Sequence, residues 1–283
     1  MPAETQETLA PRRQVTWVLG FAVVAFAITW LSGLAIVLST QATLVNGAHV
    51  VAHPLALPLP VVFTLLLLGA YGPALAALIV TAAESGRAGV RTLLGQFRRF
   101  RVGWHWYVIA LLFSNLITLI AVGLLAVFNR QAPGQWLLLP NPIRLVLLAL
   151  VVSGEELGWR GYALPKLQQR WSWVPASILV GVLWFGWHQW PLFTPAGPAV
   201  IDVGGLLTFL LYIVSASVLF AWLYNSTGGS LPIALIAHVG FDLNLVAAQG
   251  VPFLLIAVLF AVAATLVILL NRGRVWGTPP THG

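Results

Sequence analysis

The chain has 283 residues, of which 59% are hydrophobic and only 7% are charged. Soluble domains have roughly 25% charged residues, so this composition excludes an ordinary water-soluble enzyme. The chain contains no cysteine, which excludes disulfides and a thiol nucleophile. The net charge of +7 comes from basic residues that lie between apolar segments, so we attribute it to membrane topology and expect no nucleic-acid partner.

Eight apolar segments follow one another along the chain. They are continuous and do not alternate in period two, which is typical of membrane helices and not of barrel strands. We therefore predict an all-α polytopic membrane protein with about eight transmembrane helices in a lipid bilayer. A single transmembrane domain over 17–271 is flanked by the tails 1–16 and 272–283. The predicted spans are 17–39, 57–83, 104–128, 143–165, 174–191, 204–224, 231–249 and 251–271.

Most basic residues fall on one side of the membrane if these spans alternate in direction. They precede the first span, lie between the second and third and between the fourth and fifth, and follow the eighth. Because positively charged loops stay in the cytoplasm, we predict a cell-membrane protein with both termini cytoplasmic. The basic segment 86–102 is expected to be a loop that only sets topology. The alternative for this segment is an amphipathic helix on anionic lipid.

Six ionisable residues lie inside apolar segments, where a charge costs about 2.5–3.5 kcal/mol even on the lenient insertion scale. They are Glu155, Glu156, Arg160, His188, His238 and Asp242. Glu156 and Arg160 are four residues apart, so they share a helix face and can pair. Glu155 is turned by about 100° from Glu156 on a helix and can point elsewhere. His238 and Asp242 also share one face.

Each of these groups also has a purely structural interpretation. The ion pair can simply fix helix packing, and Glu155 can be a buried protonated carboxyl. His188 can belong to an interfacial aromatic belt, and His238 with Asp242 can form a hydrogen bond between helices. These interpretations are weaker together, because three separate segments each place a Glu or a His in the membrane interior.

A carboxylate and two imidazoles inside a membrane suit hydrolysis by an activated water. Glu155 can take a proton from water as a general base, His188 can hold and polarise that water, and His238 can stabilise an oxyanion. Other intramembrane protease types lack their motifs here. The sequence has no G-x-S-x-G and no H-E-x-x-H, and it has only one interior aspartate.

Three stretches resemble the motifs of the CPBP family, the type II CAAX prenyl endopeptidase or ABI family of intramembrane proteases. The stretch GEELGWRG contains E-E-x-x-x-R at 155–160. The second motif is an aromatic residue followed four positions later by histidine, which Trp184 and His188 match. The third, H-x-x-x-N or D, is matched by His238 and Asp242. The resemblance covers about residues 140–245, which it marks as a CAAX-protease-like catalytic core.

This resemblance implies an eight-helix membrane fold with endopeptidase activity. It implies that Glu155 and His188 activate water and that His238 with Asp242 forms the oxyanion hole. Trp184 stands where the commonest form of the motif has Phe, and Asp242 where eukaryotic-type enzymes have Asn. Ionised Asp cannot donate to an oxyanion, so Asp242 is either protonated or orients His238. The accompanying motif residues are Glu156, Arg160 and Trp184.

The sequence also supports expectations about a cofactor, about the substrate and about an alternative function. The family is often labelled metalloprotease, and a bound zinc ion would take Glu155, His188 and His238 as ligands. A glutamate–histidine water site needs no metal, so we expect no cofactor. The expected partner is a peptide or protein substrate, which can be membrane-anchored. The competing class is a non-enzymatic membrane protein, either a bacteriocin-immunity scaffold or a proton-coupled transporter, since buried ionisable residues also mark proton pathways.

Overall fold

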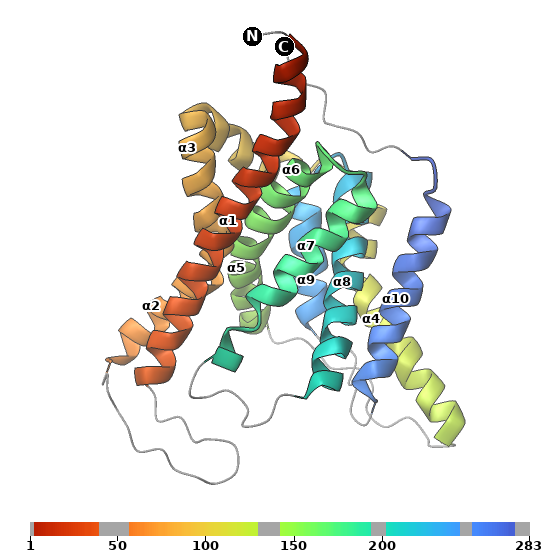
Figure 1. Cartoon of the computed structure of the whole chain (residues 1–283). Coiled ribbons are helices and arrows are strands. Elements are labelled where there is room, and N and C mark those ends of the chain that lie inside the picture. Colours follow the sequence, from red (N-terminus) through yellow and green to blue (C-terminus); the bar gives the residue numbers. More distant parts are fainter. Residues whose placement is uncertain (1–2, 40–56, 130–141, 194–201, 244–250, 275–283) are drawn as a thin grey trace.

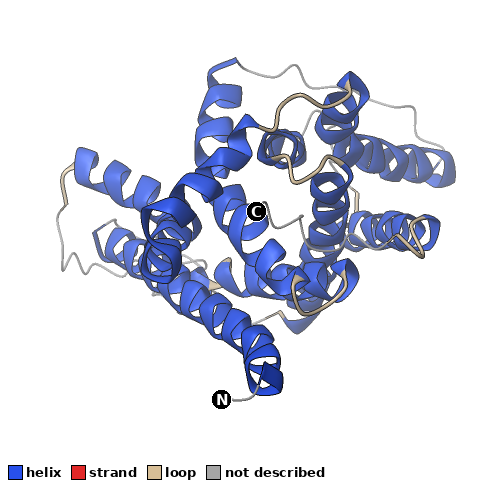
Figure 2. Cartoon of the chain, turned by 90° about the horizontal axis from the view of Figure 1, so that it is seen from above, coloured by secondary structure: helices blue, strands red, loops and turns tan. Residues whose placement is uncertain are grey.

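The computed structural model describes residues 3–39, 57–129, 142–193, 202–243 and 251–274. Within these ranges every regular element is a helix and no strand occurs, as Figure 2 shows from above. The α-helices are α1 (Ala3–Ser39), α2 (Leu59–Ala70), α3 (Gly72–Gly95), α4 (Trp104–Asn129), α5 (Pro142–Gly158), α6 (Leu164–Gln168), α7 (Trp173–Trp187), α8 (Val203–Ser226), α9 (Leu231–Leu243) and α10 (Phe253–Leu270). The predicted all-α class is therefore confirmed.

The described helices include several that can cross a membrane. Four are long and apolar enough alone, namely Arg13–Leu38 of α1, Trp104–Phe128 of α4, and the whole of α8 and α10. The helices α2 and α3 pass this test together. The helices α5, α7 and α9 have 17, 15 and 13 residues, fewer than the ~20 of a straight span. The chain is thus a multi-pass membrane protein, and eight crossings stay a prediction.

The second predicted span is not one straight helix. The chain bends by 59° between α2 and α3 at Tyr71. Pro73 lies in the first turn of α3, where its missing N–H and rigid ring are tolerated although they would break a continuous helix. The prediction of an uninterrupted segment over 57–83 was therefore wrong at this bend.

The predicted loop within the basic segment 86–102 is also wrong for most of its length. α3 continues to Gly95, and the 3₁₀ turn Gln96–Arg98 follows it. The helix changes direction at Gly86, whose φ of +60° favours glycine. Leu93 and Gln96 are buried, and the Gln96 side chain bonds the Gly161 carbonyl and the Tyr224 hydroxyl. Packing against the core therefore holds this segment in a helical form.

The shorter helices lie among the longer ones (Figure 1), and α9 packs against both α4 and α5. Gly240 permits the contact with α4, because a Cβ there would stand 2.2 Å from the Leu111 carbonyl oxygen. The Gly240 carbonyl accepts hydrogen bonds from Ser114 and Asn115 of α4. This anchor fixes α9 between its two ionisable residues, His238 and Asp242.

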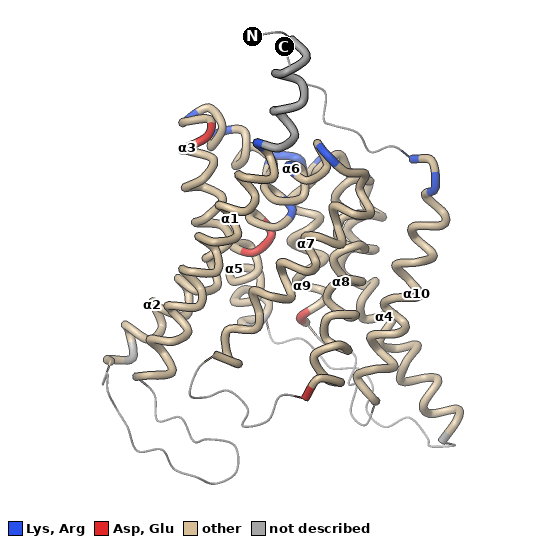
Figure 3. Tube along the Cα trace, in the orientation of Figure 1, with Lys and Arg blue, Asp and Glu red and all other residues tan. Residues whose placement is uncertain are grey.

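Charge is distributed unevenly along the bundle. Figure 3 shows most described Lys and Arg residues gathered at the end of the bundle where α10 ends, while acidic residues also lie midway along the helices. At the basic end Lys166 pairs with Glu84 across α6 and α3. This asymmetry agrees with the predicted one-sided distribution of basic residues.

Candidate active site

The end of α5 brings two adjacent glutamates into the interior of the bundle. After Gly158 the helix passes through a π-helical stretch, Trp159–Ala163, before α6. Such π-bulges frequently occur at functional sites. Arg160 lies in this stretch, and its Nη1 atom donates to Glu156 Oε1 at 2.7 Å, with both side chains fully buried. The predicted i, i+4 ion pair is present.

The guanidinium of Arg160 is enclosed by aromatic rings. Its Cζ atom lies 4.6 Å from the centroid of the Trp184 ring and 4.5 Å from that of Phe220. A planar, weakly hydrated guanidinium stacks on such rings more readily than an ammonium group does. Phe220 belongs to α8, so this contact connects the π-helical stretch after α5 with α7 and α8 around one charge. The sequence did not single out Phe220, because one more Phe in an apolar span carries no signal.

Glu156 also binds the histidine of α9. Its Oε1 atom lies 2.7 Å from His238 Nδ1. Since the Arg160-paired carboxylate oxygen only accepts, Nδ1 carries the proton of this bond. His238 Nε2 then faces Asp242 Oδ2 at 3.7 Å, which is longer than a hydrogen bond. The short contact that orients His238 therefore comes from Glu156 on α5 and not from Asp242 on its own helix.

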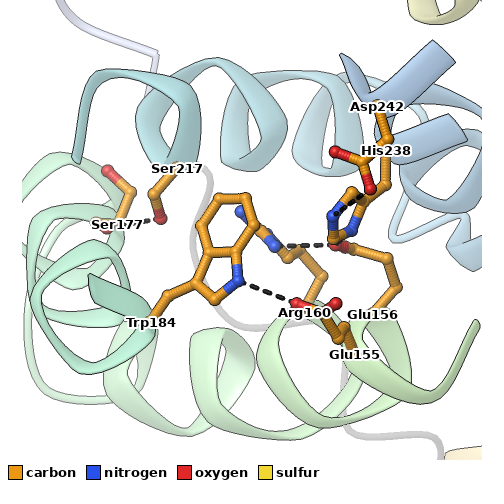
Figure 4. A network of polar contacts seen from close by, with 8 residues as sticks. All are labelled: Glu155, Glu156, Arg160, Ser177, Trp184, Ser217, His238 and Asp242. Carbon is orange, nitrogen blue, oxygen red and sulfur yellow. Dashed lines mark hydrogen bonds and ion pairs between the residues drawn. The ribbon is translucent and has the colours of Figure 1, made fainter. Parts of the chain in front are cut away.

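Glu155 points away from this ion pair, as Figure 4 shows. Its Oε2 atom accepts a hydrogen bond from Trp184 Nε1 at 2.8 Å. Trp184 is 1% exposed, and its ring lies edge-on to His238 with centroids 5.2 Å apart. The two neighbouring glutamates therefore have different surroundings. One is held by a cation and an imidazole, and the other by a neutral indole.

His188 stands immediately after the last residue of α7. Its Nδ1 lies 2.9 Å from the Trp184 carbonyl oxygen, and because a carbonyl only accepts, Nδ1 is the donor. This leaves Nε2 as the nitrogen available to a ligand. Helix α1 holds this end of α7: Trp187 donates to Thr29 Oγ1 at 2.7 Å, and that hydroxyl donates to the Gly69 carbonyl at 2.7 Å.

Two cavities meet at Glu155 and His188. The larger, of about 510 Å³, is lined by both residues together with Trp184, His238 and Asp242. The smaller, of about 220 Å³, lies between α1, α2, α5 and α7. Its other walls are mainly apolar residues of α1 and α2, helices that carried no motif in the sequence. One carboxyl and one imidazole are thus accessible from both cavities.

All seven residues singled out in the sequence converge on this region. Glu155, Trp184, His188, His238 and Asp242 line the larger cavity, and Glu156 with Arg160 lies behind them. The sequence did not reveal the bond between His238 and Glu156, nor that between Trp184 and Glu155, because both join residues distant along the chain.

The donor atoms do not form a metal site. Among the residues the structure describes, no group of three or more His, Asp or Glu side chains is placed to hold a metal ion. One nitrogen of His238 is bound by Glu156, and one oxygen of Glu155 is bound by Trp184. Glu155, His188 and His238, the alternative zinc ligand set, do not form such a group in this arrangement, and the absence of a cofactor stays a prediction.

Two comparisons with known proteins match the part of the chain that holds this site. Residues 136–244 match the family described as Type II CAAX prenyl endopeptidase Rce1-like. This segment, less than half of the chain, is similar to that family. The chain is also similar to CAAX prenyl protease 2 of Methanococcus maripaludis, with 35% identity over 132 residues, or 44% of this chain. The match spans about half of that relative, 48% of its length. The family segment holds all seven site residues, whereas α1 and α2 lie outside it.

Proposed function

We propose that the chain is an intramembrane endopeptidase that hydrolyses peptide bonds with a water activated by Glu155 and His188. The observation that supports this most strongly is that both residues line one cavity with His238, while a separate carboxylate, Glu156, binds the nearby cation. A general base must be accessible to water and substrate. Glu155 meets that condition, and Glu156, enclosed by Arg160 and His238, does not.

The reaction follows from these positions. Glu155 takes one proton from the water, whose oxygen attacks the peptide carbonyl carbon, and His188 Nε2 orients that water. The carbonyl oxygen becomes an oxyanion, to which His238 donates through a protonated Nε2. The proton on Glu155 then passes to the leaving nitrogen as the carbon–nitrogen bond breaks. Asp242 Oδ2 lies 3.7 Å from His238 Nε2, which is too long for a hydrogen bond. This nitrogen can therefore donate to the oxyanion.

The proposal includes the substrate and the absence of a metal. Because the site lies among apolar helices, a peptide or a membrane-anchored protein segment is the substrate class that it suits. Glu155 and His188 are sufficient to activate water, so no cofactor is required. Hydrolysis that continues at an unchanged rate in a strong chelator is the expected result, and loss of activity that added zinc restores would contradict this part.

The direct test is cleavage of a quenched-fluorescence peptide library by the purified protein in detergent. Wild type is expected to release fluorescence, and Glu155→Ala and His188→Ala are each expected to lose at least a hundredfold in rate, since positioned acid–base groups contribute about 10²–10⁴-fold. The variant Arg101→Met changes an exposed residue and is purified in the same way, so it controls for effects of the preparation. Equal cleavage by all variants would overturn the proposal and favour the non-enzymatic membrane protein.

We also propose that the protein lies in the cell membrane with both termini in the cytoplasm. The support is the gathering of basic residues at the end of the bundle where α10 ends. Fusions of a reporter that is active only in the cytoplasm to residue 1 and to residue 283 are both expected to be active. An active fusion at one end with an inactive one at the other would require an odd number of crossings.

A further inference from the structure

Trp184 contacts both residues that handle water in the proposed reaction. Its indole Nε1 donates to Glu155 Oε2 at 2.8 Å, and its backbone carbonyl accepts from His188 Nδ1 at 2.9 Å. One residue of α7 is therefore bonded to a side chain of α5 and to the residue that follows its own helix. The relative position of Glu155 and His188 depends on where Trp184 lies.

The ring of Trp184 has little freedom to move. It is 1% exposed, Arg160 covers one face, and His238, Phe220 and Phe241 surround it. The indole N–H can only donate, and its direction is set by this packing. A carboxylate oxygen is the acceptor that forms the shorter and stronger bond with such a donor.

We propose that Trp184 is a positioning residue whose indole N–H holds Oε2 of Glu155, so that the other oxygen, Oε1, is the one that takes the proton from water. This inference rests on the proposed endopeptidase function and concerns the same site. Phenylalanine has no N–H and cannot make the bond. The orientation of the general base is therefore assigned to one indole donor, which a single substitution removes.

A second tryptophan provides the contrast. Trp159 is fully buried, and its Nε1 has no hydrogen-bond partner among the residues the structure describes. Its ring packs edge-on against Phe21 and Trp187. Trp159 and Trp184 are thus equally buried, and replacement of either by phenylalanine removes the same atoms. Only at Trp184 does the replacement remove a bond to Glu155.

The kinetic test compares Trp184→Phe with Trp159→Phe in the peptide assay. Trp184→Phe is expected to lower kcat about tenfold, which corresponds to about 1.4 kcal/mol, with KM changed less than twofold. Trp159→Phe is expected to leave kcat within twofold even if it lowers the thermal stability. A kcat within twofold of wild type for Trp184→Phe, in a variant that unfolds like wild type, would overturn the positioning role.

A spectroscopic test detects the bond without any turnover. The 13 tryptophans are labelled with ¹⁵N, and the Trp184 indole resonance is the one that disappears in Trp184→Phe. In Glu155→Leu this proton resonance is expected to move upfield, because its acceptor is gone, while the Trp159 resonance stays in place. An unmoved Trp184 resonance would show that the bond is absent. The indole resonance reports on the bond and does not depend on hydrolysis. The endopeptidase proposal is tested separately in the peptide assay, where cleavage by Glu155→Ala at the wild-type rate would overturn it.

Discussion

Glu155→Gln is expected to lower the rate of peptide hydrolysis by about 10²–10⁴-fold, the usual contribution of a general base, and to leave the fold intact. Glutamine retains the shape of the side chain and can still accept the Trp184 hydrogen bond, but its amide does not take a proton from water. The measurement is kcat on a fluorescent peptide, with circular dichroism and thermal unfolding as the check on folding.

Glu156→Gln is the matched control, because it makes the same chemical change at the adjacent position. Its amide oxygen can still accept from Arg160 and His238, so the arrangement of the site is largely kept. It removes the charge of the carboxylate with which the fully buried Arg160 is paired, which is expected to lower stability by about 3–5 kcal/mol. The folded fraction is expected to retain more than a tenth of the wild-type kcat. Loss of activity in Glu156→Gln with normal activity in Glu155→Gln would reverse the two roles.

Local spacing predicted part of this site correctly. The four-residue separation of Glu156 and Arg160 fixed a shared helix face, and the ion pair is present at 2.7 Å. The 100° turn between adjacent residues also predicted that Glu155 would have a different environment from Glu156. These relations need only the geometry of one helix, so a single sequence is enough to specify them.

Contacts between helices were not predictable in the same way. His238 shares a helix face with Asp242, yet its short bond is to Glu156, 82 residues away. Which of two possible partners an imidazole takes depends on how α9 is placed beside α5, and part of that placement comes from Gly240 through its close contact with α4. The resemblance to the CAAX protease motifs indicated that these residues act together, but it did not specify the bond that joins Glu156 and His238.

The least predictable features lie outside the family segment. The region around Tyr71 was predicted as part of a continuous span, but the chain bends there, next to Pro73 in the first turn of α3. The region around Leu93 was predicted as a loop from its basic composition, but it is helical and Leu93 is buried in the core. In neither place did composition alone specify the backbone conformation. For the same reason the walls that α1 and α2 contribute to the smaller cavity had no sequence signal.

A large effect on stability is also expected at Arg160. Arg160→Met removes the guanidinium between Trp184 and Phe220 and leaves the Glu156 carboxylate with His238 as its partner in a site of zero exposure. Breaking a buried ion pair by removal of one partner typically costs about 3–5 kcal/mol. The measurement is unfolding in detergent micelles with added denaturant, followed by tryptophan fluorescence.

Arg101→Met is the control at an exposed position and is expected to change stability by less than about 0.5 kcal/mol. The double variant with Arg160→Met and Glu156→Gln removes both buried charges and is expected to be more stable than Arg160→Met alone, because replacement of a whole buried pair is often nearly neutral. If the double variant instead loses the sum of the two single effects, the pair has no net coupling. The stability would then come from the ring contacts of Arg160, and His238 would be oriented equally well by a neutral acceptor.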